Sequence, residues 1–273
     1  MWSKLNRIAL VVVIMVSAFG SAQPSYAAAA VGKIELVEGD VKIIDAAGQT
    51  RVPQLNSFLQ EGDTILTGKD GELHAHMDDE GYIALRPDTR LRVVSYSVNA
   101  DKTDNVALAL LKGSIRSITG WIGKKYPRNY HINAGPTATI GIRGTDHEPT
   151  VILEPSPGET RAAPPGAYDK VNSGDTYIQH PGGTIELGPS QAGYASHDPK
   201  EKPRVLDKVP EFYKPTKNES KIETRGAELS RQVDKKFEER QERKKSERKA
   251  KTTEGKTAAE RHREHIIQEI HKK

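Results

Sequence analysis

The sequence predicts an all-β domain, of sandwich, barrel or solenoid type, followed by an extended linker and a charged helical tail. From Val31 to about Tyr194, strand-sized apolar runs alternate with turns of Gly, Asp and Pro about every 8–12 residues. Four prolines then fall within residues 196–216, and from residue 217 onward proline is absent while Lys, Arg, Glu and Gln dominate. We therefore expect four segments, at residues 1–27, 31–195, 196–216 and 217–273.

The first 27 residues have the layout of a secretory signal peptide. Lys4 and Arg7 precede an apolar run over residues 8–19, and the small residues Ser25 and Ala27 stand three and one positions before a cleavage point. We expect a periplasmic or secreted product with no membrane span after cleavage. The alternative is an uncleaved anchor, but the run is shorter than the about 20 residues of a spanning helix. Because the chain has no cysteine, it can form no disulfide.

The expected β domain shows apolar runs joined by tight turns. The runs lie at residues 34–37, 41–44, 65–67, 72–77, 82–85 and 91–94. A strand–Gly–strand pattern recurs loosely around Gly39, Gly113 and Gly174, which is compatible with stacked β turns of a solenoid. The alternative is that each glycine simply marks a tight turn. The segment from Pro155 to Pro165 is rich in Pro, Gly, Ser and Ala, which predicts a loop.

The tail differs from the body in charge. Residues 201–273 contain 22 Lys and Arg against 15 Asp and Glu, which leaves 19 against 22 for the rest of the chain. A basic tail on a mildly acidic body suggests an anionic partner or surface. Four apolar residues share one helical face: Ile222, Leu229, Val233 and Phe237. Since residues 238–256 have almost no apolar side chain, we expect a solvated helix, coiled coil or partly disordered tail that adds little to the core.

Sequence motifs for catalysis are missing. There is no Cys nucleophile and no Gly-x-Ser-x-Gly elbow, and the Gly141–Thr145 segment lacks the lysine of a phosphate-binding loop. His74 and His76 lie two apart on an expected strand, so they share a face and are weak candidates for Zn²⁺ or Cu²⁺. The alternative, which we favour, is a solvent-facing polar surface. Aromatic residues make up only 5% of the chain, which argues against nucleic-acid stacking. We expect no enzyme activity, cofactor or metal.

The segment Ala138-Thr139-Ile140-Gly141-Ile142-Arg143-Gly144-Thr145-Asp146 resembles the central element of the FecR domain family. Further pieces with the family's pattern precede it in the same order: Gly39-Asp40-Val41, Leu59-x-x-Gly62-Asp63-x-Ile65-x-Thr67-Gly68, Ile83-x-Leu85-x-Pro87-x-Thr89-x-Leu91-x-Val93 and Leu110-Leu111-x-Gly113-x-Ile115-Arg116. The resemblance covers residues 31–153, and more loosely extends to 194. The sequence departs from the family at His147-Glu148-Pro149, where an aromatic and apolar strand is usual.

This resemblance implies a non-catalytic, all-β module outside the cytoplasm. Founding family members span the membrane and relay a receptor signal to a sigma factor, but this chain shows neither a cytoplasmic anti-sigma segment nor a second apolar span. The motif residues Gly141, Arg143, Gly144 and Thr145 are expected to be structural. The glycines permit a positive φ or a close backbone approach. Arg143 is expected to tie the turn to the body, with a carboxylate-binding role as the alternative.

Three functional hypotheses follow. The first is a FecR-like module that mediates protein–protein interaction or senses a signal, with an unidentified envelope protein as partner. The second is an envelope scaffold whose basic tail holds an anionic lipid or polymer. The third is a metal-dependent enzyme that uses His74 and His76. Salt-sensitive retention on anionic surfaces would favour the second hypothesis, and bound metal in the purified protein would favour the third. The first hypothesis remains if neither is found.

Overall fold

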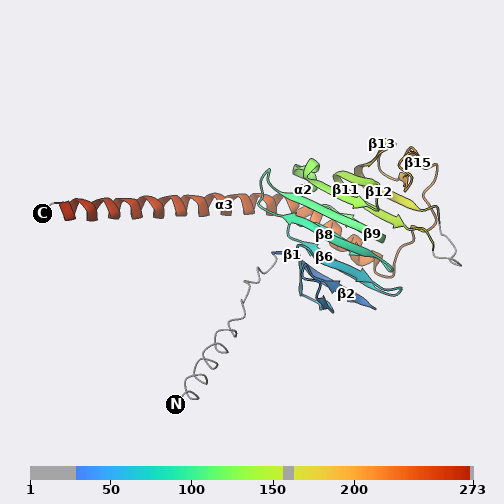
Figure 1. The fold of residues 1–273 in the computed structure, drawn as a ribbon, viewed down its shortest axis with the longest axis horizontal. Coiled ribbons are helices and arrows are strands. Elements are labelled where there is room, and N and C mark those ends of the chain that lie inside the picture. The colour runs from blue at the N-terminus through green and yellow to red at the C-terminus, as the bar shows by residue number, and fades with distance from the viewer. Residues whose placement is uncertain (1–28, 156–162, 271–273) are drawn as a thin grey trace, which may run out of the picture.

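The structure, a computed structural model, describes residues 29–155 and 163–270 and is mostly β, with one long helix at its C-terminal end (Figure 1). The expected signal peptide at residues 1–27 and the middle of the loop from Pro155 to Pro165 lie outside the described residues. The mainly β architecture and the helical tail expected from the sequence are confirmed. Among the described residues, no helix has both the length and the hydropathy of a membrane span.

Within residues 29–155 and 163–270, fifteen strands make up the β part. They are β1 (Ala30–Glu38), β2 (Val41–Ile44), β3 (Thr50–Arg51), β4 (Phe58–Gln60), β5 (Thr64–Thr67), β6 (Glu72–Met77), β7 (Tyr82–Leu85), β8 (Arg90–Ser97), β9 (Asn105–Ile118), β10 (Tyr130–Ala134), β11 (Ala138–Ile152), β12 (Gly166–His180), β13 (Gly183–Leu187), β14 (Ala192–Ser196) and β15 (Arg204–Val205). The helices are α2 (Trp121–Lys125), the 3-10 turn η1 (Pro127–Asn129) and α3 (Glu219–Ile270).

All these strands belong to one large mixed sheet. Its longest path runs β15-β14-β12-β11-β10-β9-β7-β6-β1-β4, with β2, β3, β5, β8 and β13 attached to it. Every pairing is antiparallel except that of β9 with β10, which is parallel. A parallel neighbour needs a crossover connection, and the segment that carries α2 and η1 supplies it. The sequence pattern identified strands and turns but gave no sign of this crossover.

Three long strands, β9, β11 and β12, pair with different neighbours along their length. Residues of β9 up to Lys112 pair with β8, and those from Ile115 onward pair with β7. Between them, Gly113 has a φ of +85°, a conformation that a side chain disfavours. Gly39 and Gly174, the other glycines of the loose repeat, also have positive φ values, of 64° and 77°. Each therefore marks a turn or a bend, as in the alternative interpretation of the repeat.

Most strands of the sheet share one large hydrophobic core. Apolar side chains from β2, β5 and β8 belong to the same buried cluster as those from β1, β6 and β7, so the sheet curves around a shared interior. Trp121 and Ile122 of α2 close one end of it. The core also contains Val233 and Phe237, which come from the expected tail.

Helix α3 corrects the expected organisation of the C-terminal part. Its apolar stripe is buried against the body, with exposed fractions of 0% for Ile222, 1% for Leu229, 1% for Val233 and 8% for Phe237. The outer face of the sheet presents Tyr82, Ala84 and Ile118 at this place, and these apolar side chains form a second buried cluster with Ile222 and Leu229. The tail is therefore not a separate solvated element, since its first half covers a face that would otherwise be exposed apolar surface.

The expected linker at residues 196–216 is also partly built into the body. Within it, β15 pairs with β14, and the Leu206 amide donates to the carbonyl of Ala192. Phe212 packs edge-on against Tyr168, with ring centroids 5.2 Å apart. This segment thus leads the chain along the sheet to the start of α3, from which the helix runs far beyond the body (Figure 1).

Candidate functional site

The Arg-Gly-Thr segment lies at a bend in the middle of β11. Gly144 has a φ of +64°, and register shifts occur between Arg143 and Asp146 in the pairing with β12. Gly174 on β12 stands directly beside this bend, since a Cβ atom there would lie 2.2 Å from the Gly144 carbonyl oxygen. The two strands therefore bend together. Both glycines have a positive φ, and at Gly174 there is in addition no space for a side chain.

The flanking motif residues also have defined contacts. Gly141 lies under the ring of Tyr177, because a Cβ at this position would be 2.0 Å from the Tyr177 Cζ atom. Thr145 is buried, and its amide donates to the Thr119 Oγ1 at 2.8 Å while the Thr119 amide donates to the Thr145 carbonyl at 2.9 Å. These bonds join β11 to the segment that enters α2.

Arg143 does not tie the turn to the body. Its side chain is exposed, and within residues 29–155 and 163–270 it has no hydrogen bond or ion pair. It stands directly opposite Asp175 of β12 in the register. The structural anchoring expected for this residue is therefore wrong, and the alternative, a carboxylate-binding role, stays a prediction.

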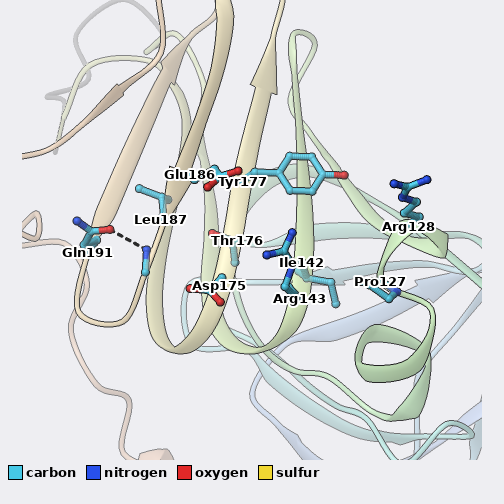
Figure 2. A pocket seen from close by; sticks show the side chains of 11 residues that line it. Pro127, Arg128, Ile142, Arg143, Asp175, Thr176, Tyr177, Glu186, Leu187 and Gln191 are labelled. Atoms are coloured by element: carbon cyan, nitrogen blue, oxygen red, sulfur yellow. Dashed lines mark hydrogen bonds between the residues drawn. The ribbon is translucent and has the colours of Figure 1, made fainter.

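Arg143 lines a pocket of about 530 Å3 on the outer surface of the sheet (Figure 2). The strands β11, β12 and β13 form its floor and one wall, and η1 contributes Arg128 on the other side. Tyr177 lies across the middle of the site, between the acidic side chains and Arg128 (Figure 2). The volume falls within the range of about 300–1,000 Å3 that is usual for small-molecule sites.

Two cationic and two anionic side chains line this pocket: Arg128, Arg143, Asp175 and Glu186. All four are exposed, and in the part of the chain that the structure describes none has a hydrogen-bond or ion-pair partner. Thr176, between Asp175 and Tyr177 on β12, stands opposite the core residues Ile142 and Leu187 and is buried, so its side chain points away from the four charges. Gln191 accepts a hydrogen bond from the Gly188 amide at 2.7 Å, which fixes the loop after β13.

A second pocket, of about 420 Å3, lies between α3 and the same bend of β11. Lys124, Gly144 and Asp146 line it from the body, and Glu223 and Gly226 line it from the helix. Burial lowers the pKa of Lys124, against the opposing effect of Asp234. The Arg-Gly-Thr bend is therefore placed between two surface pockets.

A buried cluster of charges fixes the start of α3. Glu219 accepts hydrogen bonds from Arg86 at 3.0 Å and from Arg116, and each arginine also binds an acidic residue of β11, Glu148 and Asp146 respectively. Burial tends to raise the pKa of the Glu219 carboxyl, but hydrogen bonding and charge from Arg86, helped by Arg116, hold the pKa below its usual range. The cluster therefore keeps its charges paired at neutral pH.

Glu219 also caps the helix that it anchors. Its carboxylate accepts a hydrogen bond from the Thr216 amide at 3.1 Å, while the Thr216 hydroxyl accepts one from the Asn218 amide at 3.2 Å. A Thr-x-x-Glu sequence at a helix start is a capping box. This signal was present in the sequence, but the two arginines that meet Glu219 come from distant strands and could not be inferred from spacing.

His74 and His76 do lie on one face of β6, but that face is covered by α3 rather than solvated. His74 is fully buried between Glu72, 2.6 Å away, and the Tyr82 hydroxyl, 3.2 Å away. His76 contacts Glu80 at 3.0 Å. The solvent-facing surface that we favoured is therefore wrong, because the face is needed to receive the helix. No group of three metal-binding side chains occurs among the described residues.

Other residues of the family pattern hold neighbouring strands together. Thr67 accepts a hydrogen bond from the Thr89 amide at 2.8 Å and donates to the Arg86 carbonyl at 2.7 Å. Thr89 in turn accepts from the Ser114 amide at 3.0 Å, and the adjacent Gly113 leaves room for it. Thr and Gly at these positions thus link β5, β8 and β9.

Sequence reasoning identified Arg143 but missed the other pocket residues. Asp175 and Tyr177 stand two apart on β12, which places them on one face, but nothing in the sequence indicated which strand lies beside them. Glu186 joins them only through the pairing of β12 with β13, where it is opposite Tyr177. The strand register, which is set by long-range pairing, was the missing information.

Solved structures are similar to this chain over part of its length. Two crystal structures of a "putative anti-sigma factor" from Parabacteroides distasonis align at 9% identity and a TM-score of 0.41, covering 54% of this chain and 60% of theirs. A structure described as a cell surface anchoring domain aligns at 29% identity and a TM-score of 0.22, covering 23% of this chain and 82% of its own. The chain thus spans about three-fifths of the length of the first two structures.

No curated protein matches the sequence. Residues 63–162 match the FecR protein family. These residues include β5–β11 and the Arg-Gly-Thr bend, with the strand links of Thr67, Thr89 and Gly113. From its sequence match, the chain contains a FecR family domain.

Proposed function

We propose that this chain is a non-catalytic, exported module of the cell envelope that binds another envelope protein through α3. In this proposal the β body, one large sheet folded in a sandwich-like or solenoid-like way, is the scaffold that positions the helix. The FecR family domain supports the non-catalytic role, since the motif residues described above mostly hold strands together. The signal-peptide pattern in residues 1–27 supports export.

The observation that carries the proposal is the arrangement of α3. The helix has 52 residues, which corresponds to about 78 Å at a rise of 1.5 Å per residue. Its first half is held by buried apolar side chains and the Glu219 cluster, whereas its second half extends away from the body (Figure 1). A helix that is firmly anchored and then projects presents a long surface to a partner at little entropic cost.

The second candidate, an anionic lipid or polymer as the partner, is favoured by the charge of the helix. Residues 235–251 contain nine Lys and Arg against four Glu, and most of their side chains are exposed. Such a segment attracts anionic surfaces through screened Coulomb forces. The two candidates differ in salt dependence, because a protein interface with a packed core is less sensitive to salt.

Site-specific photo-crosslinking in the periplasm tests the proposal. A photoreactive residue replaces Arg248 on the projecting part of α3, and the control has it at Ala47, in an exposed turn of the body. We expect a discrete crosslinked protein from position 248 and none from position 47. If position 248 captures no protein while the full-length protein sediments with phosphatidylglycerol vesicles at low salt only, the anionic-surface candidate replaces the protein partner.

Export has its own test. N-terminal sequencing of the protein from its native host is expected to begin near Ala28, as the positions of Ser25 and Ala27 predict. Recovery of a form that begins at Met1 in the membrane fraction would contradict cleavage and replace it with the uncleaved anchor.

A further inference from the structure

We propose that the pocket beside Arg143 binds a short peptide with free ends, of about three residues. This binding site lies on the β body and is separate from the α3 surface in the proposed function, so neither depends on the other. Four features carry the inference: the segregation of charge across the pocket, the absence of internal partners for those charges, the spacing of the strands, and the Tyr177 ring that lies over Gly141.

The charges of the pocket are separated by sign. The register places Asp175 on β12 and Glu186 on β13, and places Arg143 on β11. Arg128 extends the basic side from η1 (Figure 2). Directly opposite residues of antiparallel strands point to the same face, so Arg143, Asp175, Tyr177 and Glu186 all face the pocket. The result is a cavity with an anionic side and a cationic side.

These charges lack partners in the protein. Arg143 and Asp175 are direct cross-strand neighbours, yet they form no ion pair, and across the described residues neither they nor Arg128 and Glu186 have a hydrogen bond. Elsewhere the same chain pairs its charges closely, as Arg116 does with Asp146 at 2.7 Å. Unpaired guanidinium groups favour a carboxylate, and unpaired carboxylates favour an ammonium group. A ligand that carries both groups satisfies both sides together.

The separation between the two sides sets the length of the ligand. Glu186 and Arg143 stand on strands that are two positions apart in the sheet, and Glu186 lies opposite Tyr177, two residues along β12 from the Asp175 that faces Arg143. Together the two offsets correspond to about 12 Å. An extended peptide spans about 3.3–3.6 Å per residue, so about three residues bring the ammonium and the carboxylate within reach of the two side chains. A single amino acid is too short to reach both sides.

The centre of the pocket suits the backbone of such a peptide. Gly141 has no side chain, and the Tyr177 ring occupies the space above it. The ring offers an apolar surface between the two charged sides. The pocket therefore recognises the two ends of the ligand by charge and leaves its side chains largely unspecified.

Calorimetric titration of the full mature chain with trialanine tests the proposal. We expect saturable binding of the free peptide. Blocking either end by acetylation or amidation is expected to lower the affinity about tenfold to a hundredfold, since each block removes a charge-assisted contact. Free alanine is expected to bind at least tenfold more weakly than trialanine. Equal binding of alanine would overturn the assignment to a peptide.

Two variants connect the ends of the peptide to the two sides of the pocket. Arg143→Gln is expected to weaken the binding of free trialanine about tenfold and to leave the binding of amidated trialanine unchanged. Glu186→Gln is expected to weaken the binding of free trialanine about tenfold and to leave the binding of acetylated trialanine unchanged. Arg92→Gln removes an exposed arginine of β8 outside the pocket, as a matched control, and is expected to change nothing.

Three further results overturn the proposal. These are no binding of trialanine or of a mixed tripeptide pool, equal binding of a peptide blocked at both ends, and unchanged binding in both variants. A chain that ends after Lys244 lacks position 248 and separates this proposal from the proposed function. It keeps the pocket and the docked half of α3, and it is expected to bind trialanine normally although the crosslinking position on α3 is gone.

Discussion

The two halves of α3 have similar charged sequences but different surroundings. Residues 219–244 bury four apolar side chains and make ion pairs to the sheet, such as that between Arg225 and Glu35 at 2.8 Å. Residues 245–253 are exposed, and Ala250 is their only apolar side chain. Composition therefore does not decide whether a charged helix docks. The regular spacing of a few apolar residues, together with a sheet face that needs cover, decides it.

Truncation gives the largest expected contrast between the two halves. A chain that ends after Thr216 loses all four buried side chains of the helix, each worth about 2–5 kcal/mol. Because the summed loss is comparable to the whole stability of a typical domain, about 5–15 kcal/mol, we expect the truncated body to unfold or aggregate. A chain that ends after Thr253 is expected to keep the thermal midpoint of the full chain. Near-UV circular dichroism and thermal melting measure both, and a cooperatively folded chain 1–216 would show that docking adds nothing.

Neutralising Glu219 breaks the charged part of the docking. We expect Glu219→Gln to lower the free energy of unfolding by about 2–3 kcal/mol at pH 7, since it leaves Arg86 and Arg116 short of a carboxylate. The loss stays moderate because Glu219 keeps 16% side-chain exposure and each arginine retains a second acidic partner. Denaturant titration measures the difference.

The pH dependence of this effect has a defined sign. The folded-state pKa of Glu219 is lowered, so its contribution is fully present above the unfolded pKa of about 4.3 and is lost as pH falls through the folded value. The difference between wild type and Glu219→Gln is therefore expected to shrink below about pH 4. A constant difference down to acid pH would indicate that packing, and not charge, explains the loss.

The two glycines of α3 give a smaller, matched contrast. Gly226 lies in the docked half, where a Cβ atom would be 2.1 Å from the Ile118 Cδ1, whereas Gly255 lies in the projecting half. We expect Gly226→Leu to destabilise the protein by about 1–3 kcal/mol through overpacking. Gly255→Leu is expected to leave the thermal midpoint unchanged. Equal effects of the two substitutions would place both halves in the same environment.

Removing charge from the projecting half gives the smallest expected effect on stability. The double substitution Arg248→Gln with Lys249→Gln is expected to change the free energy of unfolding by less than about 0.5 kcal/mol, because both side chains are exposed. The same substitution weakens sedimentation with phosphatidylglycerol vesicles if that surface is the partner. A loss of stability above about 1 kcal/mol would mean that this half also packs.

The sequence was sufficient for local features and insufficient for long-range ones. Turn glycines, strand periodicity and the apolar stripe of α3 are local, and the structure has them where they were expected. The docking of that stripe was missed because the receiving residues, Tyr82, Ala84 and Ile118, alternate with core residues on strands buried on both faces. From the sequence alone, such strands look the same whether a helix covers them or not.

The candidate pocket shows the same division. Arg143 stands in a motif that could be recognised, and the bend at Gly144 follows from the glycine. The meeting of Arg143 with Asp175 and Glu186 depends on the register of three strands and on two bulges near the bend. A shift of one residue in any pairing would turn these side chains to the opposite face, so only the structure could bring them together.

The continuity of α3 across the edge of the body has a mechanical consequence. About 26 residues of the helix follow Lys244, which still bonds to the body, and this length makes a lever arm of about 39 Å. A rotation of only about 10° at the docked base would move the tip by about 7 Å, estimated from this helix length. Small rearrangements around Glu219 and Gly226 are thereby converted into large displacements at the far end, and a pull on that end is transmitted directly to the sheet.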